Sequence, residues 1–250
     1  MTYFWTDDSI RFMQDASEFS DFHERLAAFL APLLPPQARV IEAGSGLGYL
    51  SRALAPYCHS IVALDRSAAA SAVAARLAKT VPNMDAVCSD LWEYSVKKPP
   101  DAAVFCYFGR MEEILRFARK HHIPKVLVIK RDIAHHRFSL TPQPVRFESL
   151  QHSMELLENE GIAYSVSRHV LSFDQPFRSV ADAVRFFQIY SRDPDPQEIG
   201  EPQVLPRLIA DPQAPFPYLL PEAKRFAILS FSLSKHTPYD PIVAEKEKSQ

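Results

Sequence analysis

The sequence predicts an α/β protein with a Rossmann-like, seven-stranded, mostly parallel sheet and helices on both of its faces. Short apolar runs alternate along the chain with segments whose apolar residues recur every three or four positions. A glycine-rich turn follows the first apolar run, and an acidic residue ends the second. That pattern is typical of a βαβ unit with its ligand at the carboxyl ends of the strands. An N-terminal helical cap and a proline-rich insertion before the last strand complete the predicted fold.

Residues 1–36 form the predicted cap. Thr6 or Asp7 can cap a first helix that runs to Met13. A second helix is expected over residues 20–34, because one apolar stripe runs along it and two prolines follow it.

The glycine-rich turn lies within residues 38–65. Three of the six glycines of the chain fall at residues 44–48, directly after an apolar run. Glycine permits a tight turn and lets a ligand approach the backbone closely. Asp65 lies 21 residues after Gly44 and ends the next apolar run. A carboxylate there can accept both hydroxyls of a ribose, so the sequence predicts a ligand that contains a nucleoside.

The spacing of the turn favours one nucleoside ligand over others. Its glycines follow G-x-G-x-G, and Tyr49 stands where the dinucleotide fingerprint has its third glycine. Glu42 precedes the first glycine by two residues, and its charge would repel a pyrophosphate and attract an ammonium or a sulfonium. S-adenosylmethionine (SAM) combines a ribose, an amino group and a positive sulfur.

These residues resemble the class I (Rossmann-like) SAM-dependent methyltransferase family, in Glu42-x-Gly44-x-Gly46-x-Gly48, in Asp65 and in Ser89-Asp90-Leu91. The resemblance covers roughly residues 38–235. It implies SAM as cofactor, S-adenosylhomocysteine (SAH) as product, and an adenine held by Asp90 and the backbone of Leu91. An aspartate at a strand end is also a common helix cap. The predicted cofactor-binding residues are Glu42, Gly44, Ser45, Gly46, Gly48, Asp65, Arg66, Asp90, Leu91 and Tyr107.

The remaining elements follow in order. Helices are expected over residues 68–79, 111–119, 147–160 and 180–190, and strands over residues 84–88, 101–108, 125–129, 163–171 and 226–233. The resemblance implies that the last strands are antiparallel.

The strand over residues 101–108 ends at Tyr107 without the Asn/Asp-Pro-Pro-Tyr/Phe motif of amine-methylating enzymes and without an aspartate that could act as a base. Tyr107 can line the sulfonium or pack in the core. No catalytic residue is identified. Methyl transfer needs little acid–base machinery, because the sulfonium is already activated and in-line positioning supplies much of the rate.

Four residues are candidates for the wall of the substrate pocket: Trp5, His135, Gln175 and Arg178. Trp5 can also simply pack onto the first helix. His135 lies near the end of a basic segment, residues 116–137. This segment is either a solvated face or an anion site for a phosphate, a carboxylate or an RNA backbone. The net charge of −2 gives nucleic acid little support, so a small-molecule acceptor is expected.

The predicted domain organisation is a cap at 1–36, a SAM-binding core at 37–190 and 222–236, an inserted lid or small subdomain at 191–221, and a disordered tail at 244–250. The insertion holds many of the 21 prolines together with apolar anchors. It could wall the substrate pocket or form an oligomer contact.

Composition limits the remaining possibilities. The hydrophobic fraction of 47% suits a sizeable core, and the three cysteines lack metal-type spacing, so no metal site is expected. The start of the chain lacks the basic region of a signal peptide, and no apolar stretch is long enough for a bilayer, so a cytoplasmic protein without membrane contact is expected. Two alternatives to a methyltransferase stay open: a non-catalytic SAM-binding regulator or partner subunit, and an NAD-dependent oxidoreductase.

Overall fold

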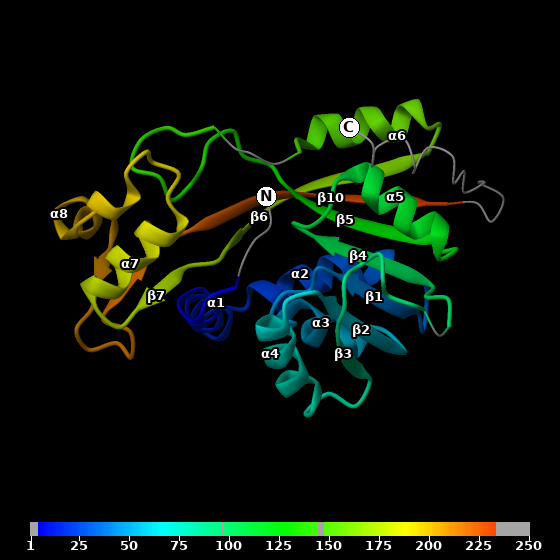
Figure 1. The fold of residues 1–250 in the computed structure, drawn as a ribbon, viewed down its shortest axis with the longest axis horizontal. Helices are drawn as coiled ribbons and strands as arrows, with labels where there is room; N and C mark the ends of the chain where they lie inside the picture. The colour runs from blue at the N-terminus through cyan, green and yellow to red at the C-terminus, as the bar shows by residue number, and fades with distance from the viewer. Residues whose placement is uncertain (1–4, 97, 145–147, 234–250) are drawn as a thin grey trace.

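The computed structural model describes residues 5–96, 98–144 and 148–233, and its centre is a seven-stranded sheet (Figure 1). The strands lie in the order β3-β2-β1-β4-β5-β10-β6. Their bounds are β1 (Arg39–Ala43), β2 (Ser60–Asp65), β3 (Met84–Cys88), β4 (Ala102–Cys106), β5 (Lys125–Arg131), β6 (Tyr164–Ser172) and β10 (Ala223–Ser232). β1 to β5 are parallel, and β10 is antiparallel to both β5 and β6. The predicted Rossmann-like fold and its antiparallel last strands are confirmed.

Two layers of helices cover the sheet, and the alternation of side chains along each strand decides which layer each residue contacts. In β4, Ala102 and Val104 pack with α2, α3 and α4, whereas Ala103 and Phe105 pack with α5 and α6. Figure 1 shows these two groups on opposite faces of the sheet. Their bounds are α2 (Phe22–Leu30), α3 (Tyr49–Leu54), α4 (Ala68–Ala78), α5 (Met111–Lys120) and α6 (Leu150–Asn159). Since both faces are buried, the strands are apolar almost throughout, as expected of a parallel sheet.

The strand order reverses between β1 and β4, which are neighbours in the sheet although β2 and β3 separate them in sequence. The helices that follow these two strands, α3 after β1 and α5 after β4, pack on opposite faces of the sheet. Ligands of open α/β sheets bind at this switch point.

A small second sheet, in the order β7-β9-β8, lies at one end of the molecule (Figure 1). Phe12, Phe177, Phe186 and Leu220 belong to the apolar cluster that joins this sheet to its helices. The elements involved are α1 (Asp7–Phe19), β7 (Gln175–Phe177), α7 (Val180–Tyr190), α8 (Glu201–Val204), β8 (Ile209–Ala210) and β9 (Tyr218–Leu220). Single-turn 3₁₀ helices are η1 (Ala31–Leu33), η2 (Ala55–Tyr57), η3 (Pro196–Glu198) and η4 (Leu205–Arg207). The residues of the predicted insertion thus carry short elements of their own, and the predicted division into domains stays a prediction.

Several element boundaries differ from the prediction. The first helix runs past Met13 to Phe19, capped at Thr6, whose hydroxyl accepts a hydrogen bond from the Ser9 N–H at 3.2 Å. The second ends at Leu30, and Pro32 continues in a 3₁₀ turn. The start of the helix predicted over 147–160 and the predicted tail at 244–250 fall outside the described residues. Among the helices that the structure describes, none combines the length and the apolar character that crossing a membrane requires.

Candidate cofactor site

The turn after β1 is tied directly to the end of β2. The N–H groups of Gly44 and Ser45 donate to the carbonyl of Leu64 at 2.8 and 3.0 Å. Gly44 and Gly46 have φ angles of +68° and +55°, in the left-handed region that residues with a Cβ adopt at a cost. The glycine spacing therefore produces the tight turn that the sequence predicts.

Asp65 joins this turn to the next helix. Its Oδ2 accepts a hydrogen bond from the N–H of Gly46 at 2.9 Å, and its Oδ1 accepts one from the N–H of Ser67 at 2.8 Å. An ionised carboxylate has about four acceptor positions, so two remain for ligand hydroxyls. Asp65, the predicted ribose-binding acid, and the backbone of the turn thus form one hydrogen-bonded unit.

Two aromatic rings cover the turn. A Cβ atom on Gly44 would lie 2.2 Å from Cγ of Phe108, and one on Gly46 would lie 2.9 Å from Cζ2 of Trp5. A ligand that approaches these glycines therefore meets the rings first. Trp5 packs against the same apolar cluster as Ile10 of α1, in line with the packing role that the sequence left open. Its predicted contact with a substrate stays a prediction. The sequence did not single out Phe108, since nothing local shows that the loop after β4 crosses the switch point.

Gly48 has a different role from the first two glycines. It precedes α3 with a φ of +82°, and a Cβ there would lie 2.8 Å from Cβ of Ala74 and 3.2 Å from its Cα. The missing side chain allows α3 to approach α4 closely. Gly48 thus serves helix packing, and its predicted contact with the cofactor stays a prediction.

Glu42 is buried below the turn and does not reach its surface. It is 2% exposed, and its carboxyl accepts a hydrogen bond from the hydroxyl of Ser51 on α3. Burial raises the pKa of Glu42 to about 8, although the Ser51 hydrogen bond opposes the rise. At neutral pH the carboxyl mostly keeps its proton. Its position therefore gives no support to the predicted attraction of a sulfonium by a charged Glu42.

The predicted adenine end lies at the carboxyl end of β3. Oδ1 of Asp90 accepts a hydrogen bond from the N–H of Trp92 at 2.9 Å. Asp90 caps a turn at residues 91–93 and not a helix, because the described residues between β3 and β4 form none. Its Oδ2 lies 4.0 Å from Nη1 of Arg66, which follows β2. Leu91 is 9% exposed and packs into the core on the α5 side. Arg66 and Asp90 are thus brought together beside Asp65, as a site across β2 and β3 requires.

Two polar atoms near the switch point lack the partners that buried groups normally have. The hydroxyls of Ser45 and Tyr107 are both buried, and neither has a hydrogen-bond partner among the described residues. Tyr107 also has a φ of +55°, a strained conformation for a residue with a large side chain. Strain and orphaned polar groups of this kind concentrate at functional sites.

The other predicted substrate residues do not lie at the turn. Gln175 is buried and donates to the carbonyl of Phe12 at 3.1 Å. Nη2 of Arg178 donates to Oδ1 of Asp15 at 2.7 Å, so both residues fasten α1 to the strand β7. His135 is exposed, in a β-bridge with Pro144. Their predicted contact with a substrate stays a prediction.

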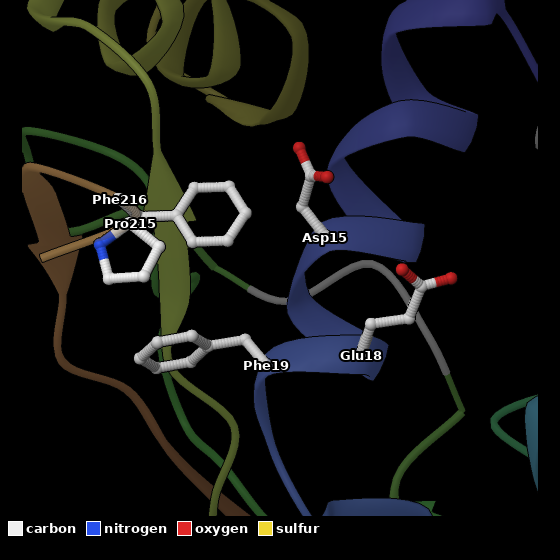
Figure 2. Close-up of a pocket in the computed structure, with 5 residues that line it drawn as sticks. All are labelled: Asp15, Glu18, Phe19, Pro215 and Phe216. Carbon is white, nitrogen blue, oxygen red and sulfur yellow. The ribbon is translucent and has the colours of Figure 1, made fainter.

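A cavity of about 270 Å³ lies between α1 and the turn that precedes β9. Figure 2 shows the side chains that line it, namely Asp15, Glu18, Phe19, Pro215 and Phe216. The two phenyl rings meet edge to face, with 6.1 Å between their centroids. Both carboxylates already have partners: Arg178 for Asp15, and the hydroxyl of Tyr49 for Glu18 at 2.7 Å. This cavity belongs to the joint between α1 and the small sheet.

The basic segment over residues 116–137 does not form one surface. Lys130 is buried and forms a salt bridge with Glu148 at 2.6 Å, so its charge does not lie on the surface. Arg119 pairs with Glu160 at 2.7 Å. Arg131 lies at the carboxyl end of β5, beside the ring of Tyr107.

Comparison with known proteins gives likeness in structure only. No protein-family profile and no curated protein match the sequence. The YcgJ protein from Bacillus subtilis shares 14% identity and a TM-score of 0.56, and the match covers 86% of this chain and 100% of that one. Magnesium protoporphyrin IX methyltransferase from Synechocystis PCC 6803 with bound SAH shares 12% identity over 94% and 90% of the chains, with a TM-score of 0.48. Precorrin-6y C5,15-methyltransferase from Geobacter metallireducens shares 13% sequence identity, and the match covers 83% of this chain and 88% of that one, with a TM-score of 0.47.

Such distant likeness concerns the fold, and the sheet order agrees with it. The chain has the Rossmann-like α/β fold, with a seven-stranded and mostly parallel sheet, that the sequence predicts.

Proposed function

We propose that this protein is a SAM-dependent methyltransferase that acts on a small molecule. The observation that carries the proposal is the hydrogen bond between the N–H of Gly46 and the carboxylate of Asp65. This hydrogen bond joins the glycine turn to Asp65, the acid proposed to bind the ribose, near the switch point of the sheet.

The residues around this unit fit SAM in their chemistry. Gly44 and Gly46 carry no side chain, so a ligand that displaces the rings of Phe108 and Trp5 meets backbone there. Asp65 has acceptor positions for ribose hydroxyls, and Ser45 has an orphaned hydroxyl. In this proposal Asp90, whose Oδ1 accepts the N–H of Trp92, offers its remaining acceptor positions to the adenine amino group. When bound, SAM supplies a methyl group already activated for transfer. The task of the chain is to hold the cofactor, exclude water and orient the acceptor, which supplies much of the rate.

An NAD-dependent oxidoreductase is less favoured. Tyr49 occupies the position of the third glycine in the dinucleotide fingerprint, and its side chain is buried with its hydroxyl bonded to Glu18. A small acceptor is favoured over nucleic acid because the charges of Lys130 and Arg119 are already paired within the chain.

Calorimetric titration of the protein with SAM, SAH and NADH tests the cofactor. Binding of SAM and SAH, together with transfer of a labelled methyl group from SAM to a small molecule in a metabolite extract, is the expected result. SAM binding without any transfer would instead indicate a non-catalytic SAM-binding protein. Binding of NADH in place of SAM would contradict the proposal.

A further inference from the structure

Three cations gather at the carboxyl edge of the sheet beside the proposed cofactor site. β10 is antiparallel to β5 with Phe226 opposite Arg131, so Lys224 lies just beyond the end of β5. Arg137, in the loop after β5, donates to the carbonyl of Ala223 at 3.3 Å. Because β1, β4 and β5 are parallel, this edge is the one that carries the glycine turn.

The ammonium of Lys224 lies among aromatic rings. Its Nζ is 3.5 Å from the ring centroid of Phe173, 4.5 Å from that of Phe22 and 5.7 Å from that of Tyr107. No carboxylate in the described part of the chain forms a salt bridge with it. Burial and then the nearby charge of Arg137 lower its pKa. An amine that has lost water without gaining a counter-ion is stabilised by a ligand that supplies one.

One described carboxylate lies near Lys224. It belongs to Glu222, which already pairs with Arg137 at 3.3 Å. The charge of Arg131 lies close to Tyr107, Cys106 and further arginines. Among the described residues, Lys224 therefore has no carboxylate of its own.

Tyr107 connects this group to the cofactor turn. Cζ of Arg131 lies 4.7 Å from its ring centroid, and Lys224 approaches the same ring. Its buried hydroxyl has no partner among the residues that the structure describes, so it can donate a hydrogen bond to a ligand. The next residue, Phe108, covers Gly44.

We propose that Lys224, Arg131 and Tyr107 form a subsite for a carboxylate or phosphate group of the methyl acceptor. The assignment rests on the proposed function, which supplies the methyl donor. An anion here gains charge-assisted contacts from the two cations and a donor from the phenol. Held at this point, the acceptor extends over the tip of β4 towards the glycine turn.

Titration with inorganic phosphate and with benzoate at constant ionic strength tests the subsite, since salt screens such contacts. Benzyl alcohol is the uncharged control ligand for benzoate. Lys224→Met keeps an unbranched side chain among the rings and removes the charge, and Arg131→Met removes the second cation. Lys79→Met is the control variant, because it makes the same Lys-to-Met change at the exposed end of α4.

We expect one of the two anions to bind the wild type and Lys79→Met equally, with affinity about tenfold or more weaker in Lys224→Met and Arg131→Met. The stronger anion identifies the acceptor group as phosphate or carboxylate. Unchanged melting temperatures would show that the variants fold. Anion affinities that are equal in all four proteins, or no anion binding by folded wild type, would overturn the subsite.

SAH binding, measured separately, keeps this test distinct from the test of the proposed function. SAH binding that survives in Lys224→Met, while anion binding is lost, supports the acceptor subsite. Anion binding at Lys224 in a protein that binds neither SAM nor SAH would overturn the assignment to a methyl acceptor.

Discussion

Two carboxyl groups flank the glycine turn, and their surroundings give them different tasks. Glu42 is buried against Ser51 and holds α3 to the sheet as a mostly protonated acid at neutral pH. Asp65, on the next strand, accepts two backbone N–H groups and keeps acceptor positions for a ligand. Both residues were predictable as polar positions near the turn, but their roles depend on burial, which a spacing pattern does not reveal.

The raised pKa of Glu42 predicts a dependence of stability on pH. Since the folded protein holds this proton more tightly than the unfolded chain, the Glu42 contribution is most favourable below about pH 4.5. It falls as the pH rises to about 8, by at most about 1.4 kcal/mol per pH unit. Glu42→Gln removes this term. Denaturant unfolding between pH 5 and 8 should show the wild type losing stability relative to the variant, while Glu93→Gln, at an exposed site, follows the wild type. Parallel profiles for wild type and Glu42→Gln would refute the assignment.

The position of Phe108 over Gly44 predicts that removing its ring changes the affinity for the cofactor. The phenyl ring contacts the face of Gly44 that a ligand must reach, so Phe108→Ala removes a competing contact. We expect SAH to bind the variant several-fold more tightly, as measured by calorimetry. Tyr57→Ala, at a similarly exposed ring on η2, should leave the affinity unchanged. Weaker binding by Phe108→Ala would mean that the ring supports the ligand and does not compete with it.

Among the elements, the βαβ unit was the most predictable part of the chain. Its apolar runs, glycines and acid are local signals, and β1, α3 and β2 form where they indicate. The strands β7, β8 and β9 have three residues or fewer, too short for any periodicity, and pairing among distant segments forms them. Lys224 went unnoticed for the same reason, because Tyr107 and Phe173 approach it only through the fold.

Close packing between α3 and α4 predicts the effect of a side chain at Gly48. Gly48→Ala places a Cβ against Ala74 in addition to straining a left-handed backbone. Gly161→Ala is a matched control, since Gly161 has a φ of +65° and a Cβ there would meet nothing within 4 Å. We expect Gly161→Ala to lose about 1–2 kcal/mol of unfolding free energy and Gly48→Ala to lose about 1–3 kcal/mol more. Equal losses would show that the helices adapt.

At the scale of the whole molecule, α1 connects the small sheet to the candidate site. Phe12 packs between Phe177 and Phe186 of the small-sheet cluster, while Glu18 accepts the hydroxyl of Tyr49 at the start of α3. Trp5, just before this helix, reaches Gly46. The sequence predicts a helical cap here, but not that the cap would join two sheets, because that depends on the position of β7.

This arrangement predicts an optical signal for cofactor binding. The chain has two tryptophans, so Trp92→Phe leaves Trp5 as the reporter. We expect SAH to change the emission of Trp5, since a ligand on the turn must alter its contact with Gly46. A second substitution, Asp65→Asn, should abolish the change. Constant emission at SAH concentrations that saturate binding by calorimetry would contradict a ligand at Gly46.

The affinity for SAH of wild type, Asp65→Asn and Asp85→Asn, measured by calorimetry, tests the central claim most directly. Asp85 is an exposed residue on the neighbouring strand β3 and controls for the loss of a negative charge. We predict that wild type and Asp85→Asn bind SAH alike, and that Asp65→Asn binds about tenfold or more weakly because it loses a charged acceptor for the ribose. Folded wild type that binds no SAH, or equal affinity in Asp65→Asn, would contradict a SAM site at this turn.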